Sequence, residues 1–268
     1  MDLTHNRLHR LDALRGLALI NMIAYHCMWD LVYLFGLDAP WYRSAGAHVW
    51  QQAICCTFIV LSGFCQPMGR RSFKRGAVVF GAGGLLSLVT LAVMPSNRVI
   101  FGVLTFLGSA MLLFTLLDQL LRRCPASVGL AMCLGMFLFT RQISSGVLGF
   151  GPLVLLQLPS TLYQNWFTTY LGLPMANFFS TDYFPLIPWV FLFGAGYYLN
   201  SICQQHSWMR YLRASTCPAL EWIGRHSLVI YLLHQPVVYG VLSAVSFIKQ
   251  LSCLPCVNFI YVAVIPNK

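Results

Sequence analysis

The segment DALRGLALINMIAYHCMWD, residues 12–30, is apolar enough to cross a bilayer and yet carries Asp12, Arg15, His26 and Asp30. Burying an Asp or an Arg at the centre of a membrane costs about 2.5–3.5 kcal/mol even on lenient insertion scales. In a helix these four side chains share one stripe, because their spacings are combinations of three and four residues. The stripe therefore predicts a spanning helix that turns a polar face toward the interior of a helix bundle.

The composition of the whole chain agrees with a membrane protein. Of its 268 residues 58% are hydrophobic and only 9% are charged, whereas soluble domains carry roughly 25% charged residues. A helix needs about 20 apolar residues to cross the hydrocarbon core, and such windows occupy 11–36, 46–68, 77–95, 98–121, 126–140, 185–203 and 227–248. The sequence predicts an all-α, polytopic transmembrane helix bundle of about seven spans, within a range of six to eight. Residues 1–250 are expected to form one domain and 251–268 a tail, in which 254–265 could be a further short membrane segment.

The basic residues are distributed unevenly between the two predicted faces. If the spans alternate, one face receives Arg7, Arg10, Arg15, Arg70, Arg71, Lys74, Arg75, Arg122, Arg123, Arg210, Arg213 and Arg225, and the other receives Arg43, Arg98, Arg141, Lys249 and Lys268. Cytoplasmic loops of membrane proteins carry the excess of Lys and Arg. We therefore expect a multi-pass protein of the cell membrane with a cytoplasmic N-terminus. The net charge reports topology, so the lipid bilayer is an expected partner and nucleic acid is not.

The ten cysteines do not form a disulfide framework. Six of them lie within apolar windows, where a thiol behaves as a small hydrophobe: Cys27, Cys55, Cys56, Cys65, Cys133 and Cys203. The single CxxC pair, Cys253–Cys256, has no second pair and no histidine at zinc-binding spacing. We expect no metal site and no permanently bound cofactor.

The segment 141–184 falls on the predicted extracytoplasmic side and is rich in aromatic residues, as in LPSTLYQNWFTTYLGLPMANFFSTDYF, residues 158–184. Interfacial Trp and Tyr side chains commonly anchor a protein at the headgroup level. A second interpretation makes the segment a lid over an extracytoplasmic substrate site. The sequence leaves both interpretations open.

Further polar side chains lie in other predicted spans. In the last span, Tyr231, His234 and Gln235 share a face with Ser227, and Pro236 is expected to kink the helix. Span 46–68 offers weaker polar groups that could bridge helices: Gln51, Gln52, Ser62 and Gln66. Together with Asp182 and Tyr183 at the outer mouth of span 185–203, they predict a polar interior that runs between the two faces. This pattern fits either a transporter or an enzyme that works across the membrane.

Several segments resemble one family of membrane enzymes. Ten residues separate Arg15 from His26, as in the Arg-x10-His signature of the transmembrane acyltransferase superfamily. The chain resembles more closely the heparan-alpha-glucosaminide N-acetyltransferase catalytic-domain family, particularly its short bacterial members. The matching segments are RLDALRGLALINMIAYHCMWDL, QQAICCTFIVLSGFC, FGVLTFLGSAMLL, TDYFPLIPWVFLFGAG and GRHSLVIYLLHQPV, which spread from residue 10 to about residue 238.

The resemblance implies transfer of an acetyl or other short acyl group, from cytoplasmic acyl-CoA to a sugar or envelope-glycan acceptor at the outer face. By position, His26 is the essential histidine and Arg15 the signature arginine near the donor, where it could contact the phosphates of CoA. Asp12 is the expected companion of Arg15. Asp30 is expected to orient the ring of His26, and His234 to act as a second acid or base. Family members often have a histidine where this chain has Thr105.

For the acceptor we expect contacts with Asp182, Tyr183, Trp189, Tyr231 and Gln235. Two other functions remain open from the sequence. One is a multi-pass transporter of a small anion or sugar, although no inverted repeat of the kind common in transporters is visible. The other is a non-catalytic membrane scaffold. Homo-oligomerisation, the identity of the acyl group and acceptor, and a direct or a ping-pong mechanism are also left open.

Overall fold

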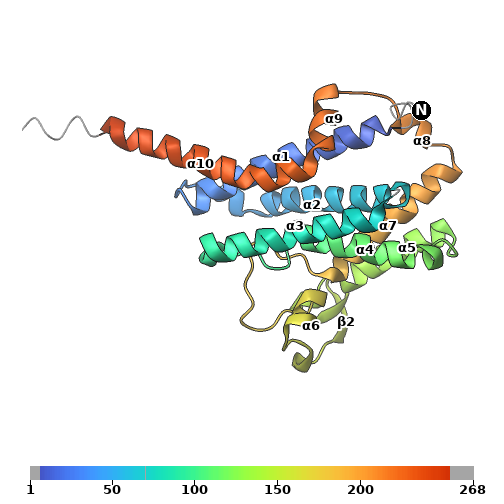
Figure 1. The fold of residues 1–268 in the computed structure, drawn as a ribbon. Coiled ribbons are helices and arrows are strands. Elements are labelled where there is room, and N and C mark those ends of the chain that lie inside the picture. Colours follow the sequence, from blue (N-terminus) through green and yellow to red (C-terminus); the bar gives the residue numbers. More distant parts are fainter. Residues whose placement is uncertain (1–6, 70, 254–268) are drawn as a thin grey trace, which may run out of the picture.

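The computed structural model describes residues 7–69 and 71–253, with side chains up to Ile248. Seven long helices run along a common axis (Figure 1): α1 (His9–Tyr33), α2 (Ala45–Cys65), α3 (Ser72–Val93), α4 (Val103–Leu121), α5 (Ala126–Thr140), α7 (Leu186–Gln205) and α10 (Ser227–Cys253). Arg70, Lys268, Cys256 of the CxxC pair and the segment 254–265 lie outside the described residues, as does the side chain of Lys249.

The predicted polytopic helix bundle is confirmed. Each predicted window overlaps one of the long helices, and six helices in the described part of the chain are long and apolar enough to cross a membrane. The seventh long helix, α1, has 25 residues and carries the polar stripe. Figure 1 shows α1 lying beside α10, with the short helix α9 (Pro218–Arg225) against its first half.

The helices approach closely where glycine faces backbone. A Cβ atom at Gly63 of α2 would overlap the carbonyl of Phe193 in α7, and one at Gly196 would overlap the carbonyl of Val60. Small residues at such crossings let membrane helices pack backbone to backbone. The core beside this contact contains fully buried Ile59 and Phe106, so α2, α4 and α7 form the centre of the bundle.

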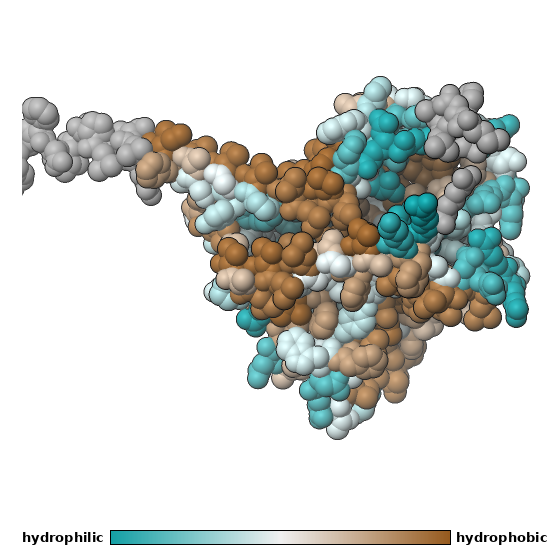
Figure 2. Space-filling model, viewed as in Figure 1, coloured by the Kyte–Doolittle hydropathy of each residue, from teal (hydrophilic) through white to brown (hydrophobic). Residues whose placement is uncertain are grey.

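One end of the bundle collects the basic residues. The start of α1, the turn between α2 and α3, the turn between α4 and α5, and the connection from α7 to α10 all lie there, and Figure 2 shows hydrophilic residues gathered at this end beside the N-terminus. The connection contains α8 (Met209–Leu212) and α9. We refer to this end as the basic end. Its orientation in a membrane stays a prediction.

A buried carboxylate ties the start of α1 to α9 at the basic end. Glu221 is 3% exposed; its Oε1 accepts a hydrogen bond from Ser215 Oγ at 2.6 Å, and its Oε2 lies 2.6 Å from His9 Nδ1. These hydrogen bonds hold the pKa of Glu221 at about 2. Further along α1, a Cβ atom at Gly16 would overlap the carbonyl of Leu220. The helices α1 and α9 are therefore packed as closely as their backbones allow.

The segment 141–184 departs from the purely helical expectation. After η4 (Ile143–Ser145) it forms an antiparallel hairpin of β1 (Val147–Phe150) and β2 (Leu153–Gln157), followed by η5 (Ser160–Leu162) and α6 (Trp166–Leu171). Gly151, with φ of 59°, allows the tight turn between two short runs of β-branched and leucine residues. Hairpin and α6 lie on the side of the bundle away from α1 and α10 (Figure 1). The remaining short helices are η1 (Pro40–Arg43), η2 (Gln66–Met68) and η3 (Pro95–Asn97).

Candidate active site

A cavity of about 300 Å³ lies in the half of the bundle away from the basic end. Helices α1, α2, α3 and α10 contribute to its wall, and Thr181, Asp182 and Phe184 contribute to it from the loop before α7. Five of the residues expected to form the site line this one cavity: His26, Asp182, Tyr231, His234 and Gln235. The polar interior predicted from separate spans therefore converges on a single space.

The two intramembrane histidines lie side by side in the wall of this cavity. The ring centroids of His26 and His234 are 5.0 Å apart, with the planes inclined by 60°. His26 comes from α1 and His234 from α10, which pack side by side. The sequence predicted each histidine separately, and the packing of these two helices makes them a pair.

The hydrogen bonding of His234 fixes where its proton resides. Nδ1 lies 2.5 Å from the backbone carbonyl oxygen of Tyr231. Because a carbonyl oxygen only accepts hydrogen bonds, Nδ1 must carry the hydrogen, and in the neutral ring Nε2 is then the unprotonated nitrogen. That Nε2 atom is buried and has no partner among the described residues. His234, a lining residue of the cavity, therefore carries a buried, unprotonated ring nitrogen.

Asp30 makes a different contact from the expected one. Its side chain is fully buried, and Oδ1 accepts a hydrogen bond of 2.7 Å from Gln235 Nε2. No hydrogen bond joins Asp30 to His26 in the described part of the chain, so the expected orienting pair is not formed. One helical turn does place the two residues on one side of α1, but the carboxylate reaches across to α10 instead. Asp30 Oδ2 and Gln235 Oε1 are buried without partners among the residues that the structure describes.

Asp182 lies in the wall of the cavity and belongs to the loop before α7. Its Oδ2 accepts a hydrogen bond of 3.1 Å from the backbone N–H of Val103, at the start of α4. A Cβ atom at Gly102 would lie 2.8 Å from the same carboxylate oxygen, so glycine leaves the room that this contact needs. Burial raises the pKa of Asp182 to about 6, although the Val103 hydrogen bond partly opposes the shift.

Backbone hydrogen bonds hold the residues around Asp182 in place. The N–H of Thr181 donates to the carbonyl of Arg98 at 3.1 Å, and the N–H of Phe184 donates to the carbonyl of Phe101 at 2.9 Å. The matching segments FGVL and TDYF thus meet in space. Of the segment 141–184, Thr181, Asp182 and Phe184 line the cavity, whereas the hairpin and α6 do not.

Asp12 and Arg15 lie at the basic end, and Arg15 is about 16 Å along α1 from His26 at 1.5 Å per residue. Arg15 Nη1 is 3.3 Å from Asp12 Oδ1, and Arg15 Nη2 donates to Cys65 Sγ at 3.1 Å. Arg7 Nε also contacts Asp12, at 3.2 Å. The expected pair forms, and it stands outside the cavity that contains the histidines.

Two expected acceptor ligands lie elsewhere. The Tyr183 hydroxyl donates to the backbone carbonyl of Thr169, which fixes the loop. Trp189 packs between Phe184 and Phe137, with ring centroids 5.1 and 5.6 Å away. Neither residue lines the cavity, because both side chains are used in packing. The expectation that they touch the acceptor is therefore not supported by their positions.

Thr105 is a packing residue in this structure. Its side chain is 7% exposed, and a Cβ atom at Gly83 of α3 would overlap it. Thr105 lies at the contact between α3 and α4 and does not line the cavity.

Sequence reasoning missed several cavity residues. Cys55, Thr90 and Asn97 line the cavity, but single small polar residues in apolar or loop segments give little signal. Gln51 also lines the cavity, whereas the sequence suggested for it only a contact that bridges two helices. No group of three His, Cys, Asp or Glu side chains that could hold a metal ion occurs within 7–69 and 71–253.

Among the comparisons with known proteins, a family model matches most of the chain. Residues 7–236 match the family model described as "Heparan-alpha-glucosaminide N-acetyltransferase, catalytic". No curated protein and no solved structure matches the chain. The matched range starts just before α1 and ends directly after Gln235, so it contains every residue of the cavity.

Proposed function

The chain belongs to the heparan-alpha-glucosaminide N-acetyltransferase catalytic-domain family, and we propose that this membrane acetyltransferase moves an acetyl group from cytoplasmic acetyl-CoA to a carbohydrate acceptor at the outer face. The observation that carries the proposal is the pair of adjacent histidines, one of which has a buried Nε2 atom without a partner among the described residues. The positive-inside rule supports a cytoplasmic basic end. Acetyl transfer would then take place in the outer half of the bundle.

His234 is the proposed general base. An acceptor N–H or O–H gives its proton to His234 Nε2 while the acceptor atom attacks the carbonyl carbon of the thioester. The new bond from carbon to nitrogen or oxygen forms as the carbon–sulfur bond breaks. The thiolate of CoA leaves with the electron pair and takes the proton from His234. The fixed tautomer of His234 prepares the ring for this exchange.

His26 is the proposed partner of the acetyl group. Its ring centroid lies 5.0 Å from that of His234 and both residues line the cavity, so a carbonyl group in the cavity beside the pair would reach both rings. A ring N–H of His26 that donates to the carbonyl oxygen would stabilise the negative charge of the tetrahedral intermediate. The resemblance makes His26 essential, and this role accounts for it without an acetylated histidine.

Unpartnered atoms in and beside the cavity favour an acceptor substrate rich in hydrogen-bond donors. Gln235 lines the cavity and Asp30 is its hydrogen-bond partner; Gln235 Oε1 and Asp30 Oδ2 are both acceptor atoms, and both are buried without partners among the described residues. Leaving such atoms unpaired costs about 1–3 kcal/mol each. The hydroxyl and amino groups of a sugar would satisfy them. Asp182 at the outer loop is placed to meet the same ligand.

Arg15 is the proposed contact for the phosphates of the donor, with Asp12 holding its guanidinium in position. The alternative of a small-anion or sugar transporter would use the same cavity without acetyl-CoA. The match to an acetyltransferase family supports the enzyme.

The test uses proteoliposomes with radiolabelled acetyl-CoA on one side and a glucosamine-containing oligosaccharide on the other. Labelled oligosaccharide in the acceptor compartment, dependent on His26 and His234, is the expected result. Passage of the unmodified oligosaccharide in the absence of acetyl-CoA would instead establish a transporter.

A further inference from the structure

The cavity that His26 and His234 line, here called the histidine cavity, has one side that helix packing does not close. Helix α1 packs against α10 and α2, α2 packs against α7, and α3 packs against α4. No comparable packing joins α3 to α10 in the described part of the chain, although both of these helices line the cavity. We refer to this side, between α3 and α10, as the side opening.

On α3, the stripe that lines the histidine cavity borders directly on the outer surface of the bundle. Leu86, Thr90 and Met94 line the cavity at intervals of about one turn, and each of them is partly exposed. Their chain neighbours Leu85 and Val89 are 60% and 49% exposed. The lining stripe therefore lies at the margin between the cavity and the lipid-facing surface of α3.

The facing side of α10 has the same character. Leu232 lines the cavity and is partly exposed, while Val229 and Leu233 beside it are exposed. Figure 2 shows the apolar surfaces of α10 and α3 with a strip of more hydrophilic residues between them. An amphipathic molecule at the side opening would thus meet apolar helix surfaces on both flanks and polar groups further in.

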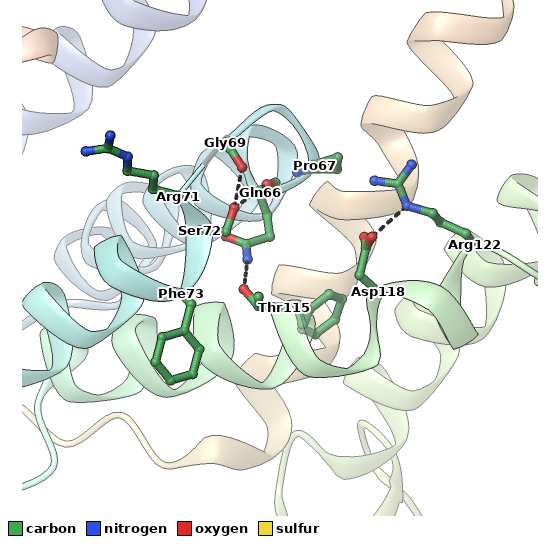
Figure 3. A pocket seen from close by; sticks show the side chains of 10 residues that line it. Gln66, Pro67, Gly69, Arg71, Ser72, Phe73, Thr115, Asp118 and Arg122 are labelled. Atoms are coloured by element: carbon green, nitrogen blue, oxygen red, sulfur yellow. Dashed lines mark hydrogen bonds and ion pairs between the residues drawn. The ribbon is translucent and has the colours of Figure 1, made fainter.

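The side opening lies at the depth of the outer leaflet when the basic end is cytoplasmic, as proposed above. Arg71 lies where α3 begins, at the basic end (Figure 3), and a guanidinium group stays in the headgroup region. Leu86 and Met94 follow Arg71 by fifteen and twenty-three residues, which is about 22 and 34 Å along the helix at 1.5 Å per residue. Because the hydrocarbon core is about 30 Å thick, the opening extends from the outer half of the core to the outer headgroups.

Away from the side opening, the histidine cavity has polar lining groups. Gln51 of α2 and Asn97 line it, and their side-chain amides form no hydrogen bond with any residue that the structure describes. Thr181 and Asp182 line it from the loop before α7. Amide, hydroxyl and carboxyl groups offer both donors and acceptors to the hydroxyl groups of a sugar. The cavity is therefore polar at α2 and this loop and largely apolar at the side opening.

The charge of the lining restricts the ligand further. Neither lysine nor arginine lines the histidine cavity, and the carboxyl group in its wall is that of Asp182. A phosphate group inside the cavity would lack a cationic partner, and burying an unpaired charge is costly. A sugar that enters with a lipid attached should therefore be joined to it by an uncharged link.

We propose that the acceptor of the acetyl group is a glycolipid of the outer leaflet whose sugar is joined to its hydrocarbon chain by an uncharged link. The sugar occupies the histidine cavity near Gln51 and Asn97, and the chain leaves through the side opening into the membrane. This inference rests on the proposed function and names the class of its acceptor.

The transfer step is the one given above, with a glycolipid hydroxyl or amino group as the attacking atom. The acetyl carbon forms its new bond to that oxygen or nitrogen, and the carbon–sulfur bond of acetyl-CoA breaks. The proton of the acceptor passes through His234 to the CoA thiolate.

The first experiment detects the glycolipid without any turnover. Dodecyl glucosaminide with a photoreactive diazirine in its alkyl chain is added to the full-length protein in liposomes and irradiated, and mass spectrometry locates the labelled residues. We expect the label on Leu86, Met94 or Leu232, and we expect an excess of dodecyl glucosaminide to remove it. Label that spreads over the exposed helix surfaces and resists the competitor would overturn the proposal.

The same labelling tests the uncharged link. Dodecyl glucosaminide and glucosaminyl dodecyl phosphate, which inserts a phosphate between the sugar and the chain, are compared as competitors. Because no lysine or arginine lines the cavity, the phosphate compound should compete at least about tenfold more weakly. Equal or stronger competition by the phosphate compound would contradict the uncharged link.

A bulky side chain at the side opening tests the route of the acceptor. Transfer is measured to dodecyl glucosaminide and to methyl glucosaminide, which has the same sugar without the long chain. In the wild-type protein we expect kcat/KM to be at least about tenfold higher for the dodecyl compound. Leu86→Trp should lower this ratio at least about fivefold. Leu88→Trp, at a position that is 67% exposed on α3 and outside the cavity lining, should keep it.

The outcomes for the two acceptors separate this inference from the proposed function. Equal kcat/KM for the methyl and dodecyl compounds, or an unchanged ratio in Leu86→Trp, would refute the glycolipid acceptor and leave acetyl transfer in place. Acetylation of neither compound would refute the proposed function, while the labelling would still test the side opening. If Leu86→Trp does not fold, the labelling of the wild-type protein decides the question.

Discussion

The hydrogen bond between Gln235 and Asp30 is expected to hold the two halves of the candidate active site together. It joins α10 to α1 at 2.7 Å, directly beside His234 and one turn from His26. Gln235→Leu introduces an apolar side chain of similar size and removes the hydrogen-bond partner that a fully buried carboxyl group has among the described residues. The helices would then have to separate, or Asp30 would stay unpaired.

The size of the effect follows from the burial. A hydrogen bond to a carboxylate contributes about 1.5–3 kcal/mol, and leaving a buried polar group without its partner costs about 1–3 kcal/mol, or more if the group is charged. Taking about 3 kcal/mol for Gln235→Leu and about 2–4 °C per kcal/mol for a chain of this size, we expect the melting temperature to fall by about 6–12 °C. The assay is thermal unfolding in detergent, followed by tryptophan fluorescence. Gln119→Leu, the same substitution at an exposed position of α4, is the matched control.

The double variant provides the stricter test of this reasoning. Replacing both partners of a buried polar pair by apolar side chains is often close to neutral. The variant Asp30→Leu, Gln235→Leu should therefore be more stable than Gln235→Leu alone. If the two losses simply add, or if Gln235→Leu melts with the wild-type protein, the hydrogen bond does not have the role assigned to it.

Three further changes test other parts of the structure. His234→Gln should lower acetyl transfer by about 10²–10⁴-fold with little change in acetyl-CoA binding; a turnover number within a few-fold of wild type would exclude the general base. Because burial raises the pKa of Asp182 to about 6, the stability that protonated Asp182 contributes is complete below about pH 4 and is lost as the pH rises through about 6. Melting temperatures from pH 4 to 7.5 should therefore fall with pH in the wild-type protein relative to Asp182→Asn, and parallel curves would disprove the shift. Gly16→Ala should push α1 away from the Leu220 carbonyl and cost about 1–3 kcal/mol, seen as a lower melting temperature, whereas Gly84→Ala, which meets no neighbouring atom within 4 Å, should not.

The bundle was predictable because spanning helices leave a strong signal in composition. Long apolar windows and the distribution of arginines located every long helix and the end at which the basic residues gather. The hairpin at 147–157 gave no comparable signal, since its residues read equally well as an interfacial loop. Its strands depend on the Gly151 turn and on pairing with each other, which hydropathy does not report.

The candidate site was predictable as a set of residues but not as a set of contacts. Helical spacing placed His26 and Asp30 on one side of α1, and from this the two were expected to interact. The structure instead joins Asp30 to Gln235, which lies 205 positions later in the chain. A pattern within one helix cannot reveal which neighbouring helix will supply a partner. For the same reason the pairing of His26 with His234, and the use of Trp189 in packing, appear only in the folded chain.

The most direct measurement is the turnover of radiolabelled acetyl-CoA by the detergent-purified wild-type protein, His26→Ala and His48→Ala. His48 is an exposed histidine at the start of α2 and serves as the matched control. We expect the wild-type protein and His48→Ala to release CoA with a sugar acceptor present, and His26→Ala to bind acetyl-CoA without turning it over. Undiminished CoA release by His26→Ala, or no binding of acetyl-CoA by the wild-type protein, would contradict the assignment of the histidine cavity as the site of acetyl transfer.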